Sequence, residues 1–103
     1  MIHHIVFFKF KESVKEPDIR KLEDGLGSLP ARIPEIRRYE LGRDVMRSDR
    51  SFDFALDSSF DDLDSLRRYS GHPEHQKVLK HINEICSSIK SVDFETNTDE
   101  AAH

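Results

Sequence analysis

The chain has 103 residues, of which 36% are hydrophobic and 35% are charged, which is typical of one folded domain with one core and not of a disordered chain. Its 16 basic residues are outnumbered by 20 acidic ones, so the net charge of −4 argues against nucleic acid or an anionic membrane as a partner. The small apolar share indicates that a second subunit completes the burial of apolar surface.

The first half of the chain predicts a strand, a helix and a second strand. Residues 2–10 carry apolar side chains on both faces, which is typical of a strand in the middle of a covered sheet. Ser13 and Glu16 have capping-box spacing and precede leucines at helical spacing, so a helix should begin there. Residues 36–41 alternate as a strand does, and residues 43–51 form a charged hairpin loop.

The second half predicts a third strand, two helices and a last strand. Residues 52–60 alternate between apolar and polar side chains, and Asp61 is the expected N-cap of a short helix. A second amphipathic helix should run over residues 73–88, followed by a strand over residues 91–95.

The junction of these two helices, Tyr-Ser-Gly-His-Pro-Glu-His from Tyr69 to His75, concentrates the polar chemistry of the chain. Glycine is common just past a helix end and proline in a first turn, so Gly71 should end one helix and Pro73 should begin the next. His72 is then the junction residue, with a side chain that can cap the following helix. His75 lies on the apolar stripe and should point towards the sheet.

The order β-α-β-β-α-α-β predicts an α+β fold, a four-stranded antiparallel sheet of ferredoxin-like type with helices on one face. The opposite face carries Ile5 and Phe7, an apolar patch that predicts a homodimer in which two sheets form an α+β barrel. We assign residues 1–95 to this domain and expect residues 96–103 to be a flexible tail. The helix-covered side should take His4, Val6, Phe8, Phe52, Phe54 and Leu56, with Val92 and Phe94 also pointing inward.

The compartment follows from the only cysteine and from the first residues. Cys86 has no second cysteine to pair with, which suits a reducing cytoplasm. The segment MIHHIVFFKF is too short for a membrane span and lacks the cationic start of a signal peptide. We therefore expect a cytoplasmic protein.

Five segments resemble the stress-responsive dimeric α/β-barrel (Dabb) family: HHIVFFKFK, IPEIRRYELGRDV, SFDFAL, YSGHPEH and VDFE. The likeness runs from about Ile2 to Glu95, and the H-P-x-H element with its upstream tyrosine is its most specific part. It implies a homodimer of ferredoxin-like protomers and, for most members, no established activity.

The resemblance also implies candidate site residues. Plant polyketide cyclases of the olivetolic acid type in this family use a tyrosine and the second histidine of this element as an acid–base pair for an aldol cyclisation, with a first-strand histidine in the pocket. The matching positions here are Tyr69, His75 and His4. Several other positions are smaller or more polar than a pocket for a long alkyl polyketide would have: Ser58, Ser70, Gly71, Val78 and Cys86.

Each of these side chains has a chemical and a structural interpretation. A histidine in a first helical turn is held neutral by the helix dipole, so His75 could act as a base while Tyr69 donates to a substrate oxyanion. Alternatively, His75 bonds a backbone carbonyl and ties the helices together, Tyr69 is a core aromatic, and His4 is a core histidine with a polar partner. His72 and His75 need not point together, so we expect no metal and no other cofactor.

The sequence therefore predicts a stress-response barrel protein that binds a small, mostly apolar molecule between sheet and helices. One alternative is an enzyme, a lyase, cyclase or isomerase with His75 as the general base and Tyr69 at the oxyanion. Another is a purely structural or assembly protein. The expected pocket is lined by His4, Val6, Phe8, Leu56, Tyr69, His75 and Val78.

Overall fold

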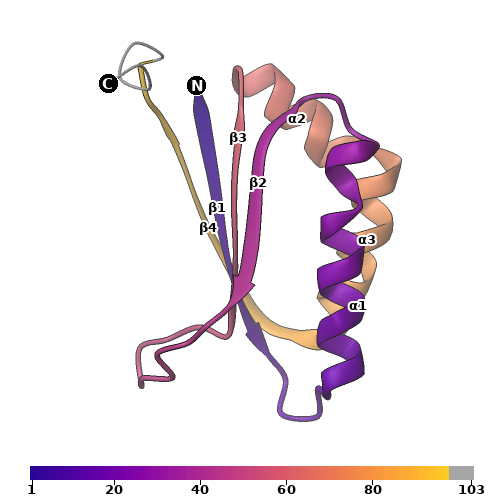
Figure 1. Cartoon of the computed structure of the whole chain (residues 1–103), viewed down its shortest axis with the longest axis vertical. Helices are drawn as coiled ribbons and strands as arrows, with labels where there is room; N and C mark the ends of the chain where they lie inside the picture. The colour runs from indigo at the N-terminus through magenta and orange to yellow at the C-terminus, as the bar shows by residue number, and fades with distance from the viewer. Residues whose placement is uncertain (98–103) are drawn as a thin grey trace.

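A computed structural model describes residues 1–97 and shows one antiparallel sheet covered on one face by helices (Figure 1). The elements are β1 (Ile2–Phe10), α1 (Glu16–Gly27), a 3-10 turn (Leu29–Ala31), β2 (Ile36–Arg43), β3 (Phe54–Phe60), α2 (Leu63–Gly71), α3 (Pro73–Ile85) and β4 (Cys86–Glu95). The strand order is β2-β3-β1-β4, with β1 between two neighbours. The predicted ferredoxin-like α+β fold is therefore confirmed.

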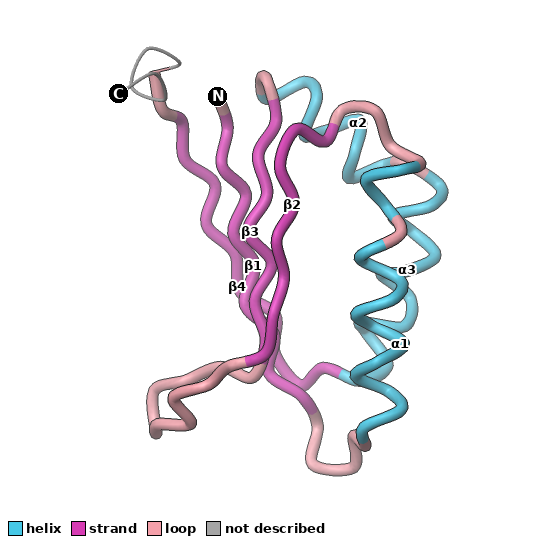
Figure 2. Tube along the Cα trace, viewed as in Figure 1, coloured by secondary structure: helices cyan, strands magenta, loops and turns pink. Residues whose placement is uncertain are grey.

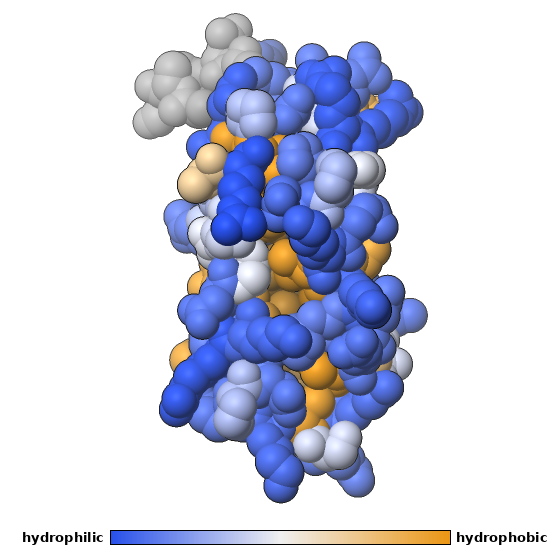
Figure 3. All heavy atoms as spheres, turned by 90° about the vertical axis from the view of Figure 1, so that its right-hand side faces the viewer, coloured by the Kyte–Doolittle hydropathy of each residue, from blue (hydrophilic) through white to orange (hydrophobic). Residues whose placement is uncertain are grey.

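The helices lie on one side of the sheet and leave the other side open (Figure 2). Alternation along β1 assigns side chains to these two sides, since neighbouring residues of a strand point to opposite faces. Val6 and Phe8 are buried under the helices, whereas Phe7 is 39% exposed on the open face. From the helix side, the molecule presents mostly hydrophilic atoms with apolar residues in the gaps between them (Figure 3).

Two predictions about which face a residue occupies are wrong. Val92 and Phe94 pair with Ile5 and His3, so they lie on the open face and are 53% and 44% exposed. Phe52 precedes β3 and its ring lies 6.1 Å from that of Phe7, also on the open side. Alternation alone could not reveal this. The strand begins two residues later than predicted, so Phe52 belongs to the preceding loop and does not follow the alternation of β3.

The end of α3 and the start of β4 also differ from the prediction. The helix ends at Ile85, and Cys86 begins the strand instead of continuing the helix to residue 88. Cys86 pairs with Phe10, and the N–H of Lys11 donates to the carbonyl of Ile85 at 2.8 Å. Pairing with β1 thus replaces helical bonds in a segment whose Cys and Ser residues are weak helix formers.

The two predicted helix caps are each displaced. The first helix starts after Lys15, whose N–H donates to the Asp18 carboxylate at 3.0 Å, so Ser13 caps nothing. At α2 the cap is Asp62, which accepts from the N–H of Ser65 at 2.8 Å, whereas Asp61 pairs with Arg37. Asp61 and Asp62 are both possible caps from the sequence, and only Asp62 is placed to accept from the N–H of Ser65.

The C-terminal end of β4 is joined to the start of β1. Thr96 and Met1 exchange hydrogen bonds of 2.9 Å, and the Thr96 hydroxyl lies 2.8 Å from Nε2 of His3. Thr96 is thus held beyond the predicted boundary at residue 95, and residues 98–103 of the predicted tail lie outside the described part. Within residues 1–97, no helix is both long and apolar enough to cross a membrane.

Candidate functional site

The α2–α3 junction is organised by His72. This residue is both the C-cap of α2 and the N-cap of α3. Its N–H donates to the carbonyl of Tyr69 at 3.1 Å, and its Nδ1 accepts from the N–H of Glu74 at 3.1 Å. Gly71 is the last residue of α2 and Pro73 is the first of α3. These bonds fix the helix ends and so position the side chains before and after them.

His75 is tied to the backbone through one ring nitrogen. Its Nδ1 lies 3.0 Å from the carbonyl oxygen of Ser70, which also accepts from the side-chain amide of Gln76 at 2.7 Å. Because a carbonyl only accepts, Nδ1 carries the hydrogen and the neutral ring leaves Nε2 as an acceptor. Burial lowers the pKa of His75, which favours this neutral form.

Tyr69 lies against His75 and is 1% exposed, with 4.5 Å between the two ring centroids. Its hydroxyl is 2.7 Å from the hydroxyl of Tyr39 on β2. Burial raises the pKa of Tyr69 to about 12, although the bond to Tyr39 acts in the opposite direction. At neutral pH Tyr69 is therefore protonated and has a hydrogen to donate.

His4 approaches the same cluster from β1. Its ring meets Tyr69 edge-on with 6.2 Å between centroids, and its Nδ1 contacts the carboxylate of Asp93 on β4. Asp93 holds His4 in one tautomer, with the hydrogen on Nδ1, because a carboxylate accepts and does not donate.

Sequence reasoning missed Tyr39 and Asp93. Asp93 sits opposite His4 in the antiparallel register of β1 and β4. The expectation that Val92 and Phe94 point inward placed Asp93 on the open face. Because those two residues lie on the open face, Asp93 lies on the helix-covered face, where its side chain is 40% exposed. The available signal was the pairing of β4 with β1: if Val92 pairs with Ile5, the next residue, Asp93, must share the face of His4.

These polar groups lie at a cavity of about 190 Å³ between the sheet and the helices. Of the predicted lining residues, the structure brings together His4, Val6, Phe8, Leu56, Tyr69 and His75. Val78 does not line it, because Val78 faces Gly25 of α1. The rest of the lining is Ser70, Leu79, Ile82, Ile89 and Ser91. Of the positions noted as unusually small or polar, Ser70 alone reaches the cavity.

The histidines of the junction and Cys86 show no sign of metal binding or of a reactive thiol within the described residues. The Nδ1 atoms of His72 and His75 are both occupied by backbone partners, and among residues 1–97 no group of three or more His, Cys, Asp or Glu side chains is placed to hold a metal ion. Burial raises the pKa of the Cys86 thiol to about 11, so it stays protonated and is a poor nucleophile.

Comparison with known proteins agrees with this architecture. The sequence model of the Dabb family, described as a stress responsive A/B barrel domain, matches residues 2–96. An uncharacterized protein of Streptomyces coelicolor is 35% identical over 78 residues, which cover 74% of this chain and 80% of that protein.

Solved structures share the fold. A dimeric ferredoxin-like protein of unknown function from Thermobifida fusca superposes with a TM-score of 0.85 at 30% identity, over 92% of this chain and 90% of the other. Hydroxynitrile lyase from Passiflora edulis has a TM-score of 0.84 at 21% identity over 93% of each chain, a likeness of fold alone. Because the family model spans nearly the whole described chain, this protein belongs to the stress-responsive A/B barrel (Dabb) family.

Proposed function

We propose that this protein binds a small, mostly apolar molecule in the cavity beside His75. The observation that carries the proposal is a cavity with apolar walls on which three polar side chains, His4, Tyr69 and His75, converge. Such a combination is the usual form of a small-molecule site. The volume of about 190 Å³ is below the range of roughly 300–1,000 Å³ for drug-sized ligands, so the ligand is small.

A homodimer formed through the open face of the sheet is the second part of the proposal. This face exposes Phe7, Val92 and Phe94 beside Ile5, and the Thermobifida fusca protein of the same fold is dimeric. Burial of these side chains against a second copy removes apolar surface from water. Cytoplasmic residence also stays a proposal, supported by the unpaired Cys86.

Sedimentation tests the dimer directly. The wild-type chain should sediment as a dimer at micromolar concentration, and Val92→Lys should shift it towards monomer. Lys21→Glu on α1 is the matched exposed control and should leave the dimer intact. A wild-type protein that is monomeric under these conditions contradicts the proposal.

Catalysis is the second candidate function, and the tautomer of His75 favours it. With Nδ1 bonded to Ser70, the bare Nε2 is the group that could take a proton from a carbon next to a carbonyl. Tyr69, protonated at neutral pH, would donate to the oxygen on which negative charge develops. A small-substrate lyase, cyclase or isomerase suits this pair, and a hydroxynitrile lyase is built on the same fold.

A thermal-shift screen separates these functions from a structural role. The panel comprises small phenols, β-keto compounds and lactones, tested on the wild type, His75→Gln and Tyr69→Phe. Ligand binding to the native state raises the melting temperature by mass action. A hit that shifts the wild type and fails on His75→Gln supports binding at this site, and turnover of that hit, lost in both variants, supports catalysis.

The same screen can refute the binding proposal. Glutamine has an amide N–H donor but no basic ring nitrogen, so His75→Gln removes the base and keeps a polar side chain of similar size. If no compound shifts the wild type and His75→Ala alone is severely destabilised, His75 is a helix tie and the structural alternative is correct.

A further inference from the structure

The loop between β2 and β3, residues 44–53, presents two neighbouring apolar side chains to solvent. Val45 is 94% exposed and Met46 is 78% exposed, more than any other large apolar side chain within residues 1–97. Asp44 and Arg47 flank them in the sequence. Adjacent exposed apolar side chains with polar neighbours are typical of a contact site, whereas a single one is ordinary. Neither the proposed ligand site nor the sheet contacts of the proposed dimer involve this apolar pair, Val45 and Met46.

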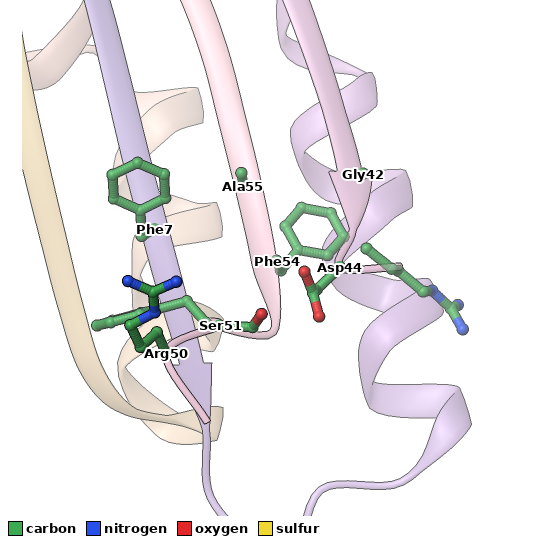
Figure 4. A pocket seen from close by; sticks show the side chains of 9 residues that line it. Phe7, Gly42, Asp44, Arg50, Ser51, Phe54 and Ala55 are labelled. Atoms are coloured by element: carbon green, nitrogen blue, oxygen red, sulfur yellow. The ribbon is translucent and has the colours of Figure 1, made fainter. Parts of the chain in front are cut away.

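The β2–β3 loop leaves the sheet on the side opposite to the helices (Figure 1). The open face of the sheet lies on that same side. A cavity of about 450 Å³ joins the two, with Arg50 and Ser51 of the loop and Phe7 and Ala55 of the strands around it (Figure 4). The loop and the open face therefore form one continuous hollow surface, and a molecule that covers the face also meets the loop.

A second sheet on the open face lies beside the β2–β3 loop. Two sheets that pack face to face are about 10 Å apart. A second protomer in that position therefore occupies the space into which the loop projects. A two-fold dimer makes each contact twice, so the loop of each protomer lies beside the other protomer. This step rests on the homodimer proposed above.

The loop is held in one shape by its own polar contacts. The N–H of Asp44 donates to the carbonyl of Asp53 at 2.9 Å, and the Asp44 carboxylate accepts from the N–H of Arg47 at 2.6 Å. The hydroxyls of Ser48 and Ser51 lie 2.8 Å apart. Arg47 has a φ of 55°, a left-handed conformation that a non-glycine residue keeps only where its surroundings impose it. A loop that is ordered before binding loses less conformational entropy on binding, which favours its use as a contact.

We propose that the β2–β3 loop is an arm that clasps the second protomer, with Val45 and Met46 packed against that protomer. The partner is a second copy of this chain because the loop is continuous with the face that the homodimer is proposed to use. Contact with the second copy removes the apolar pair from water, which stabilises the dimer. The inference adds a contact outside the sheet to the dimer proposed above.

Sedimentation equilibrium over a series of concentrations tests the arm through the dimer dissociation constant. The wild type is compared with a double variant, Val45→Ser with Met46→Ser. Both side chains are exposed in the single chain, so the double variant should fold as the wild type does, and its circular dichroism spectrum checks this. We expect its dissociation constant to rise at least tenfold, because the substitutions remove apolar surface that is buried only in the dimer. Leu63→Ser is the matched control, since Leu63 is an exposed apolar residue of α2, on the helix side of the sheet, and this change should leave the dissociation constant unaltered.

Isotope-filtered NMR detects the contact itself. Protomers labelled with ¹³C at the methionine methyl groups are mixed with unlabelled protomers, so that a filtered NOE reports contact between two different chains. We expect filtered NOEs from the methyl group of Met46. Its signal is assigned by its loss in Met46→Leu.

The inference is overturned if the wild type is a dimer and the double variant dimerises as tightly, or if the Met46 methyl group shows no filtered NOE in the mixed dimer. Equal weakening by Leu63→Ser also overturns it, since the loss is then not specific to the loop. These results leave the homodimer itself in place. A wild type that stays monomeric overturns both the homodimer and the arm, so the two failures are distinguishable.

Discussion

The hydrogen bond between the hydroxyls of Tyr39 and Tyr69 links β2 to α2. Tyr39→Phe should show how much this bond contributes to the stability of the protein. The substitution keeps the ring and removes one oxygen, which leaves the Tyr69 hydroxyl without a partner in the described structure. Tyr69 is 1% exposed, so the lost bond can be replaced only from the small cavity beside His75, and we expect that replacement to be incomplete. An unpaired buried hydroxyl costs about 1–3 kcal/mol, and we expect Tyr39→Phe to lower the free energy of unfolding by about 1–2 kcal/mol.

The double variant, Tyr39→Phe with Tyr69→Phe, measures the interaction energy between the two hydroxyls. Tyr69→Phe leaves the Tyr39 hydroxyl unpaired in turn, and burial raises the pKa of that hydroxyl, so this variant should also cost about 1–2 kcal/mol. Removing both hydroxyls leaves no unsatisfied group. The combined loss should therefore be smaller than the sum of the two single losses by about 1 kcal/mol.

Urea unfolding of the four proteins at one protein concentration measures this cycle, since the stability of a dimer depends on concentration. Independent sites add to within about 0.3–0.5 kcal/mol. If the double variant is additive to that level, or if Tyr39→Phe costs nothing, the hydroxyl pair does not contribute as its 2.7 Å separation indicates.

Three further predictions concern the junction and the helices. Because burial lowers the pKa of His75, the unfolded chain binds a proton more readily, so the melting temperature should fall as pH drops below the ordinary histidine pKa of about 6.5, and His75→Gln should flatten that fall; equal slopes would contradict it. Gly25→Ala should stabilise the protein by roughly 0.5–1 kcal/mol in thermal unfolding, because a Cβ there lies 3.4 Å from Val78, an ordinary contact; a loss would show that α1 cannot accommodate it. Long-range ¹H–¹⁵N spectra should show His4 protonated at Nδ1, and Asp93→Ala should release that tautomer; an unchanged spectrum would exclude Asp93 as its cause.

Local rules were sufficient where the chain's own spacing determines the structure. Residues 2–10 are apolar on both faces, and β1 occupies the centre of the sheet as such a pattern requires. Gly71 and Pro73 end and begin helices for reasons of backbone conformation that do not depend on the rest of the fold. The junction that carries His75 could therefore be predicted from seven consecutive residues.

Long-range pairing decided the features that were missed. The position of Asp93 depends on the register between β1 and β4, and a shift of one residue moves a side chain to the other face. Cys86 is the first residue of β4, and not part of α3, because it pairs with Phe10 of β1. Tyr39 joined the site through Tyr69, on an element remote in sequence. None of these contacts has a local signature, so the site's polar partners required the tertiary structure.

The alternation of β1 also explains how one small sheet can serve both a ligand cavity and a subunit contact. Val6 and Phe8 line the cavity beside His75, whereas Phe7, between them in sequence, is exposed on the open face that we propose for the dimer. The hydrogen-bonded backbone of the sheet separates the two sets of side chains, so a substitution on one face leaves the contacts of the other in place. His75→Gln and Val92→Lys are consequently controls for each other: the first should abolish ligand binding and keep the dimer, and the second should weaken the dimer and keep ligand binding. Loss of both properties in either variant would mean that the two faces are not independent, and that the sheet itself had changed.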